Sequence, residues 1–248
     1  MSGPASIAWL KPEWPAPPAV RALSTFRGGG VSAAPFASLN LGDHVGDAPA
    51  AVADNRRCLM AAAGLHAEPE WLSQVHGARV VDLDTAAPWS SADAAVTRQP
   101  GRVCAVLTAD CLPILLAGET GCAVAAAHAG WRGLAAGVIE AAVRALGLRP
   151  AELIAWLGPA IGPRHFEIGA EVREALLRTD PGAGPCFTAN SRGRFMADLP
   201  GLARRRLMAL GLTRIYGGSE CTFSDADRYF SHRRDGRCGR QATLIWLD

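Results

Sequence analysis

A series of short apolar runs in the middle of the chain limits the fold more than any other feature of the sequence. The runs are ARVVDLD (78–84), GRVCAVLTA (101–109), LPILLA (112–117) and CAVAAAH (122–128). Segments of this length, rich in small or β-branched residues and bounded by Gly, Pro and polar residues, are typical of buried β-strands. The sequence therefore predicts sheet structure at the centre of the molecule.

Helical patterns and further strands surround these runs. Helices are predicted over 49–63, about 132–146, 168–179 and 198–211. Gly64 and Gly147 would end the first two helices, and Asp198 would cap the last one. Further strands are predicted near 21–26, 152–158, 213–218 and 242–248. Because strands cluster without strict βαβ alternation, we predict an α+β fold with mixed, sandwich-like sheets flanked by helices.

The size of the chain favours one domain. With 248 residues, of which 49% are hydrophobic, the chain can bury a substantial core. No repeat, low-complexity tract or block of charge divides it. We therefore predict a single domain over residues 1–248, in which the Pro-rich residues 1–20 form an extended lead-in.

Charge and cysteine content exclude several classes of partner. The 25 Lys and Arg residues nearly balance the 23 Asp and Glu residues, so no general attraction for nucleic acid or acidic membranes is expected. The chain begins without the pattern of a signal peptide, and no run approaches the roughly 20 apolar residues that span a bilayer. Seven cysteines, an odd number, disfavour a disulfide framework. We expect a cytoplasmic protein that binds neither nucleic acid nor membranes.

Three residues that can bind a metal fall at the ends of predicted strands. They are His76 in QVHG, Cys111 in TADCLP and His128 in HAGWRG. Two imidazoles and one thiolate suit Zn²⁺, and three protein ligands leave the fourth tetrahedral position for water or substrate. The spacing alone leaves a second interpretation open, in which a buried free cysteine and two histidines bond to backbone groups.

The order of the motifs supplies a resemblance. The chain carries, in this order, STFRGGGVS, SLNLGDHVGD, NRRCL, LSQVHGARVV, TADCLPILL, AAHAGWRG, GPAIGPRHFEIGAEV and FSHRRDGRCGRQATLIWL. Together these segments closely resemble the YfiH-type family, also labelled a laccase-domain or polyphenol oxidase family. The resemblance covers the chain from about residue 22 to its C-terminus. The resemblance implies an α+β fold and a zinc ion held by His76, Cys111 and His128. It also implies that these three residues are catalytic.

Several arginines are candidates for binding an anion such as phosphate. Arg132 stands where a helix is predicted to begin, and Arg27 precedes three glycines whose backbone could form an anion nest. Asn40 is a candidate polar contact to the ligand, and at least one of Arg233 and Arg234 would face it. The structural alternatives are a surface ion pair for Arg132, a hairpin connection for the glycines and a solvated face for the C-terminal arginines.

Four functions are compatible with these features. The resemblance implies a purine nucleoside phosphorylase that acts on adenosine, inosine or S-methyl-5′-thioadenosine with phosphate, together with adenosine deaminase activity. A second function is an amidase that edits peptidoglycan precursors. A third is a copper polyphenol oxidase, but six histidines are few for several copper centres. The fourth is a non-catalytic metal-binding module, for which a fourth protein ligand is lacking.

Overall fold

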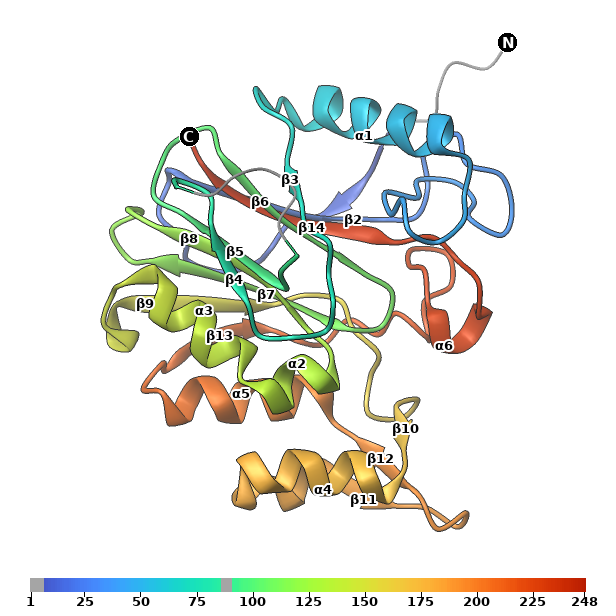
Figure 1. Cartoon of the computed structure of the whole chain (residues 1–248), viewed down its shortest axis with the longest axis vertical. Coiled ribbons are helices and arrows are strands. Elements are labelled where there is room, and N and C mark those ends of the chain that lie inside the picture. Colours follow the sequence, from blue (N-terminus) through green and yellow to red (C-terminus); the bar gives the residue numbers. More distant parts are fainter. Residues whose placement is uncertain (1–6, 86–90) are drawn as a thin grey trace.

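The computed structural model describes residues 7–85 and 91–248, and its elements form four layers (Figure 1). Helix α1 (Pro49–Ala63) covers the outer face of a five-stranded sheet, which packs on a six-stranded sheet. The far face of the second sheet is covered by α2 (Trp131–Ala136), α3 (Val138–Leu146) and α5 (Leu199–Ala209). The predicted α+β fold, with mixed sheets flanked by helices, is confirmed.

The five-stranded sheet joins the two ends of the described chain. Its order is β1 (Trp9–Leu10), β2 (Val20–Thr25), β14 (Gln241–Leu247), β6 (Val103–Thr108) and β3 (Glu70–Trp71). Strand β14 is antiparallel to both β2 and β6. Its successive side chains alternate between layers, since Leu244 packs in the core under α1 and Ile245 packs between the sheets.

The six-stranded sheet carries the candidate metal ligands at one end. Its order is β13 (Arg214–Gly217), β9 (Leu153–Leu157), β7 (Leu112–Gly118), β8 (Val124–Ala129), β5 (Ala94–Thr97) and β4 (Val80–Asp82). Strands β7 and β8 form an antiparallel pair that is buried along its whole length. Both faces of this sheet are covered, which explains why its strands are continuous apolar runs instead of alternating ones.

A smaller unit projects from the layers at the lower end of the view in Figure 1. It contains a three-stranded antiparallel sheet of β10 (Glu167–Ile168), β12 (Phe195–Ala197) and β11 (Phe187–Ala189), with helix α4 (Ala170–Thr179) beside it. Two 3₁₀ helices, Pro150–Glu152 and Pro181–Cys186, and the short helix α6 (His232–Asp235) complete the described elements.

Two sequence predictions need correction. The helix predicted over 132–146 is interrupted at Gly137, whose φ of 87° ends α2 and begins α3. The predicted lead-in is partly a strand, because Trp9 and Leu10 pair with β2; residues 1–6 lie outside the described residues. Helix α1 is confirmed, with Gly64 in the left-handed conformation after it. Among the residues described, no helix has both the length and the apolar character needed to cross a membrane.

Candidate metal centre

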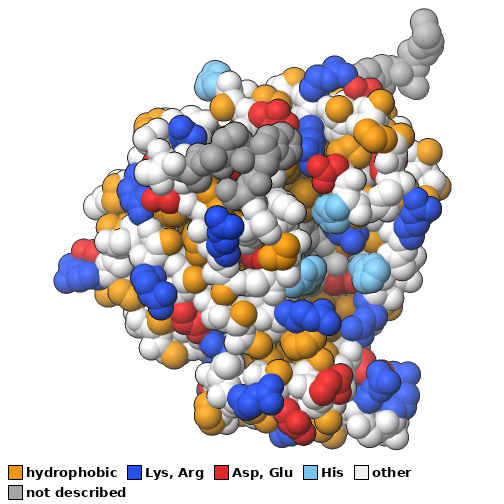
Figure 2. All heavy atoms as spheres, viewed as in Figure 1, with side chains coloured by type: hydrophobic (Ala, Val, Ile, Leu, Met, Phe, Trp, Pro, Cys, Tyr) orange, Lys and Arg blue, Asp and Glu red, His pale blue; other side chains and the backbone are white. Residues whose placement is uncertain are grey.

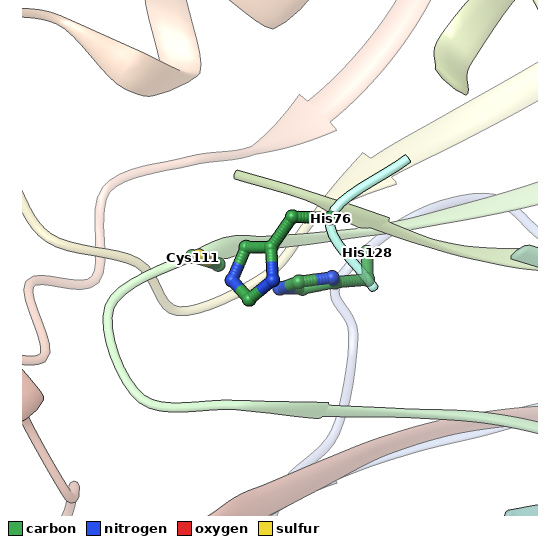
Figure 3. A group of neighbouring side chains, drawn as sticks. All are labelled: His76, Cys111 and His128. Atoms are coloured by element: carbon green, nitrogen blue, oxygen red, sulfur yellow. The ribbon is translucent and has the colours of Figure 1, made fainter. Parts of the chain in front are cut away.

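His76, Cys111 and His128 meet at one end of the six-stranded sheet (Figure 3). Cys111 immediately precedes β7 and His128 lies near the end of the antiparallel β8, while His76 comes from the loop before β4. One ligand atom of each residue lies within 4.8 Å of the others. Tetrahedral Zn²⁺ needs ligand atoms about 3.5 Å apart, so a contraction of roughly 1 Å would complete the site.

Asp93 organises the centre although it is not among the three ligand candidates. Its fully buried carboxylate accepts a 2.8 Å hydrogen bond from His128 Nδ1, which directs Nε2 of that ring toward the centre. The same carboxylate accepts the backbone N–H groups of Val75, His76 and Gly77 at 3.2, 2.9 and 2.7 Å. One side chain therefore fixes both a ligand ring and the loop that carries another ligand.

The charge of Asp93 suits this role. Burial raises the pKa of the Asp93 carboxyl, but hydrogen bonds from His128 and from the Gly77 backbone outweigh that effect and leave the pKa lowered. The carboxylate is consequently ionised at neutral pH. A carboxylate on the far nitrogen of a metal-binding histidine raises the basicity of the ligand and holds its orientation.

The Cys111 thiol is tuned toward the thiolate form. Burial raises its pKa, but the charge of His128 and hydrogen bonds with His128 and His76 have the larger effect and lower the pKa to about 6. The pKa of His128 is raised to about 9: burial lowers it, but the negative charges of Cys111 and Asp93 prevail. The protein alone thus holds a thiolate and an imidazolium in contact, which is a set that a cation can enter by displacing a proton.

Two residues of the centre have backbones in the left-handed region. His76 has a φ of 59° and Asp110, which precedes Cys111, has a φ of 92°. Residues other than glycine adopt this region rarely, and they do so mostly where surrounding bonds impose it. For Asp110 those bonds come from the Thr222 hydroxyl at 2.7 Å and the Arg233 backbone N–H at 2.6 Å.

The glycines of HAGWRG provide space at the centre. A Cβ at Gly130 would lie 2.7 Å from Cys111 Sγ and 3.4 Å from a ring carbon of His76. A Cβ at Gly133 would lie 3.1 Å from the Gly77 carbonyl oxygen. The loop bearing His76 can therefore pack against the start of α2 only because these positions lack side chains.

Lys or Arg side chains lie beside histidine side chains on one face of the molecule (Figure 2). On the face shown in Figure 2, histidine side chains gather around a depression, with Lys or Arg side chains directly below them. Arg132 is exposed, and its guanidinium lies 4.5 Å from the Trp131 ring centroid. Helix α2 is only six residues long, which makes its dipole a weak contributor to anion binding.

The structure distinguishes the two C-terminal arginines. Arg234 is half-buried, and its guanidinium donates to the carbonyl oxygens of Thr222, Phe223 and Tyr229. Arg233 is exposed; one of its guanidinium nitrogens donates to the Glu167 carbonyl, and its backbone is tied to Asp110 beside Cys111. Arg233 is therefore the better candidate for a ligand contact.

Arg27 and Asn40 make extensive contacts within the protein. Arg27 donates to the carbonyl oxygens of Ala37 and Ala226 and lies 4.8 Å from the Phe230 ring centroid. Asn40 is fully buried; its amide donates to the Gly42 carbonyl and to Asp47, and accepts from two backbone N–H groups. These contacts hold the loops together, and the ligand contacts predicted for both residues stay predictions.

Asp93 and Asp110 were missed by sequence reasoning. Asp93 had a usable signal, because it is an acidic residue inside the apolar run ADAAV, where only a paired carboxylate can be buried. Asp110 stands directly before Cys111 in TADC, but only the tertiary structure shows that it joins this loop to Thr222 and to the turn of Arg233.

A family model described as multi-copper polyphenol oxidoreductase laccase matches residues 21–248. The chain belongs to this laccase-domain family, which includes the YfiH proteins. The name of the family mentions several copper ions. Within residues 7–85 and 91–248, however, the structure brings together one group of three or more potential ligands, the His76, Cys111 and His128 set.

Family members with curated names share most of their length with this chain. A protein of Pseudomonas aeruginosa named purine nucleoside phosphorylase is 55% identical over 241 residues, which cover 97% of this chain and 98% of the relative. The purine nucleoside phosphorylase YfiH of Escherichia coli is 50% identical, with 96% and 98% covered. These names support an enzyme of the purine nucleoside phosphorylase type.

Solved structures in the family share the fold. A Neisseria meningitidis protein has a TM-score of 0.92 at 46% identity, covering 97% of this chain and 99% of its own. YlmD of Geobacillus stearothermophilus has a TM-score of 0.90 at 33% identity, covering 96% of both chains.

Proposed function

We propose that this laccase-domain protein is a zinc-dependent purine nucleoside phosphorylase that acts on adenosine, inosine and S-methyl-5′-thioadenosine, with a secondary adenosine deaminase activity. The observation that carries the proposal is the convergence of two imidazoles and a thiolate, positioned by a buried carboxylate, at a centre whose neighbouring segments carry the exposed residues Arg132 and Arg233. The names of relatives at 55% and 50% identity support the reaction class.

The donor set favours zinc as the metal. His76, Cys111 and His128 are three nitrogen and sulfur donors, and no other residue described by the structure joins their group as a fourth ligand, as in catalytic zinc sites. Zinc bound there would supply a Lewis acid with one open coordination position, able to polarise the substrate. Copper is the less favoured alternative, which the family name suggests.

The protein's own residues would hold the reactants. We assign phosphate to Arg132 and Arg233, whose exposed guanidinium groups carry a charge that a dianion would neutralise. In phosphorolysis, a phosphate oxygen bonds to the anomeric carbon while the bond from that carbon to the base breaks. The bonding electron pair leaves with the base, which takes up a proton. Binding phosphate beside the nucleoside converts this into a reaction between neighbours.

An amidase acting on peptidoglycan precursors is the second candidate, because the lowered pKa of Cys111 would also suit a nucleophilic thiolate. Under that hypothesis the arginines would bind a carboxylate of the substrate, and free phosphate would have no role.

A product assay with and without phosphate tests the proposed function. Purified protein should convert inosine or adenosine to free base and ribose 1-phosphate only when phosphate is present, because the sugar is transferred to phosphate and not to water. Arg132→Ala removes a charge-assisted contact worth about 1.5–3 kcal/mol, so it should slow phosphate-dependent turnover by one to two orders of magnitude. Equal release of base without phosphate, or cleavage of a cell-wall amide and of no nucleoside, would contradict the phosphorylase.

A further inference from the structure

A pocket of about 350 Å³ opens next to the loop that carries His76. It is lined by Asp43, His44, Trp71, Leu72, Ser73 and Gln74. Gln74 is two residues before His76, so their Cα atoms are separated by at most about 7 Å of extended chain. The volume of the pocket lies at the lower end of the range for small-molecule sites. A small ligand in the pocket would therefore lie beside the loop that carries His76.

The wall of this pocket is fixed before any ligand arrives. The Gln74 side chain donates to the Leu107 carbonyl at 2.8 Å and accepts the Leu107 N–H at 2.7 Å. The Ser73 carbonyl accepts the N–H of Ala92, next to Asp93. The segment that forms the wall is thus held to β6 on one side and to the metal centre on the other, so binding a ligand need not order it.

The lining combines an apolar floor with a polar rim. Trp71 and Leu72 are each only 6% exposed and form the floor. On the rim, the side chains of Asp43 and His44 keep 57% and 54% of their surface accessible. The Arg56 guanidinium lies 3.4 Å from the Asp43 carboxylate and anchors it.

The rim groups match a flat heteroaromatic ligand. Partial burial and the charge of Arg240 lower the pKa of His44, against the opposing pull of Asp43, so this imidazole is neutral at pH 7. A neutral ring can stack on another ring without a counter-charge. The Asp43 carboxylate is an acceptor for ring N–H or amino groups.

An exposed valine lies in the chain between the pocket residue Gln74 and the metal-ligand candidate His76. Val75 lies between Gln74 and His76 and is 57% exposed, although large apolar side chains elsewhere in the described chain are nearly all covered. Apolar surface left open at the edge of a pocket is typical of a ligand-binding site. A ligand that extends from the pocket toward His76 would cover this side chain.

We infer that this pocket holds the purine ring of the nucleoside, with His44 and the apolar floor against its faces and Asp43 at its edge. The inference rests on the proposed function, because it takes a nucleoside as the ligand. The ribose is the poorer occupant, since its hydroxyl groups and puckered ring would leave the floor and Val75 without an apolar partner.

Calorimetric titration with inosine in phosphate-free buffer tests the pocket. His44→Ala should weaken inosine binding about tenfold, because aromatic stacking on a base is lost. His44→Phe keeps a flat ring and should bind inosine within about threefold of wild type. His66→Ala, at an exposed position in the loop after α1, is the matched histidine control and should bind like wild type. Zinc content should be equal in all four proteins.

Further titrations separate the base from the sugar. His44→Ala should weaken hypoxanthine binding as much as inosine binding, and should leave the affinity for ribose 1-phosphate unchanged. With phosphate present, KM for inosine should rise about tenfold while kcat changes by less than about twofold, because ring binding is uniform between ground and transition states.

Three outcomes would overturn this assignment. If wild-type protein cleaves inosine with phosphate but His44→Ala binds inosine as tightly as wild type, the pocket is wrong and the phosphorylase stands. If the Ala and Phe variants lose affinity equally, His44 supports its loop and does not stack on the ring. If wild type neither binds nor cleaves any purine nucleoside, the proposed function fails and the pocket assignment fails with it.

Discussion

The Asp93 carboxylate accepts hydrogen bonds from two of the three segments that carry candidate metal ligands. It holds the His128 ring through Nδ1 and three consecutive backbone N–H groups around His76. Cys111 has its own support, because Asp110 ties the residue before it to Thr222 and Arg233. At the residue scale, the geometry of the centre is therefore set largely by two aspartates that bind no metal themselves.

Replacing Cys111 tests the identity of the thiolate ligand. We expect Cys111→Ala to lose zinc and turnover, because the site would keep only two protein donors. Cys238→Ala is the control, because Cys238 is a buried free cysteine whose contact is with Arg240 and not with the metal-ligand candidates. Elemental analysis should show about one zinc ion per chain in wild type and in Cys238→Ala. The nucleoside assay should show turnover in the same two proteins. Equal loss of zinc in both variants would show that Cys111 had been wrongly assigned as the thiolate ligand.

How far the sequence predicts the centre follows from where each residue's partners lie. His76, Cys111 and His128 are found from motifs, since their chemistry is visible in the residue types. Asp93 becomes significant only when β5 pairs with β8 and brings it to His128. The different roles of Arg233 and Arg234 depend on carbonyl groups supplied by distant loops, which no local pattern encodes.

At the scale of elements, a break at Gly137 divides the helical segment that follows His128 into α2 and α3. Gly137 ends α2 after six residues and starts α3, and it takes a φ of 87° that side chains disfavour. The apolar periodicity of 132–146 continues through the break, which explains why the sequence predicted a single helix. A glycine in a helical pattern gives no indication by itself whether its φ is positive.

Changing Gly137 isolates the cost of that conformation. A Cβ there would lie 3.5 Å from Glu140, an ordinary contact, so Gly137→Ala should destabilise the fold through backbone strain alone, by about 1 kcal/mol. Thermal melts should show Tm lowered by roughly 2–4 °C. Gly137→Asn should lose less, because asparagine tolerates the left-handed region better. An alanine variant as stable as wild type would mean that α2 and α3 can merge into one helix.

The elements that sequence reasoning missed are the short ones. Strands β3, β5, β10, β11 and β12 have two to four residues each, too few to show a periodicity of their own. Such segments are strands only because a partner strand lies beside them, so tertiary pairing decides their structure. The long buried strands were predictable from their continuous apolar runs, and α1 was predictable from its helical pattern.

At the scale of the whole molecule, zinc should bind the folded state and not the unfolded chain, because its ligands come from three separate segments. Zinc at about 100 times its Kd should then stabilise the fold by about 2.7 kcal/mol and raise Tm by roughly 5–10 °C at pH 7.5. Binding should weaken as the pH falls, because zinc must displace the His128 proton, whose pKa is about 9, and because the Cys111 thiolate, with a pKa of about 6, is protonated below pH 6.

Differential scanning fluorimetry with and without zinc, at pH 7.5 and at pH 5, measures this effect. The stabilisation should be large at the higher pH, small at the lower pH and absent in Cys111→Ala at both. A shift in Tm of the same size for Cys111→Ala would show that zinc stabilises the protein from elsewhere.

The position of β14 in the five-stranded sheet affects how the chain is made. Strands β2 and β6 have no contact in the sheet except through β14, whose residues follow Thr108 by more than 130 positions. At a synthesis rate of about 5–20 residues per second, the edges of both strands that face β14 stay unpaired for roughly 7–27 s before their partner leaves the ribosome. During that interval the protein depends on whatever shields unpaired strand edges from aggregation, and a ribosome that stalls before Gln241 releases a chain unable to close its first sheet.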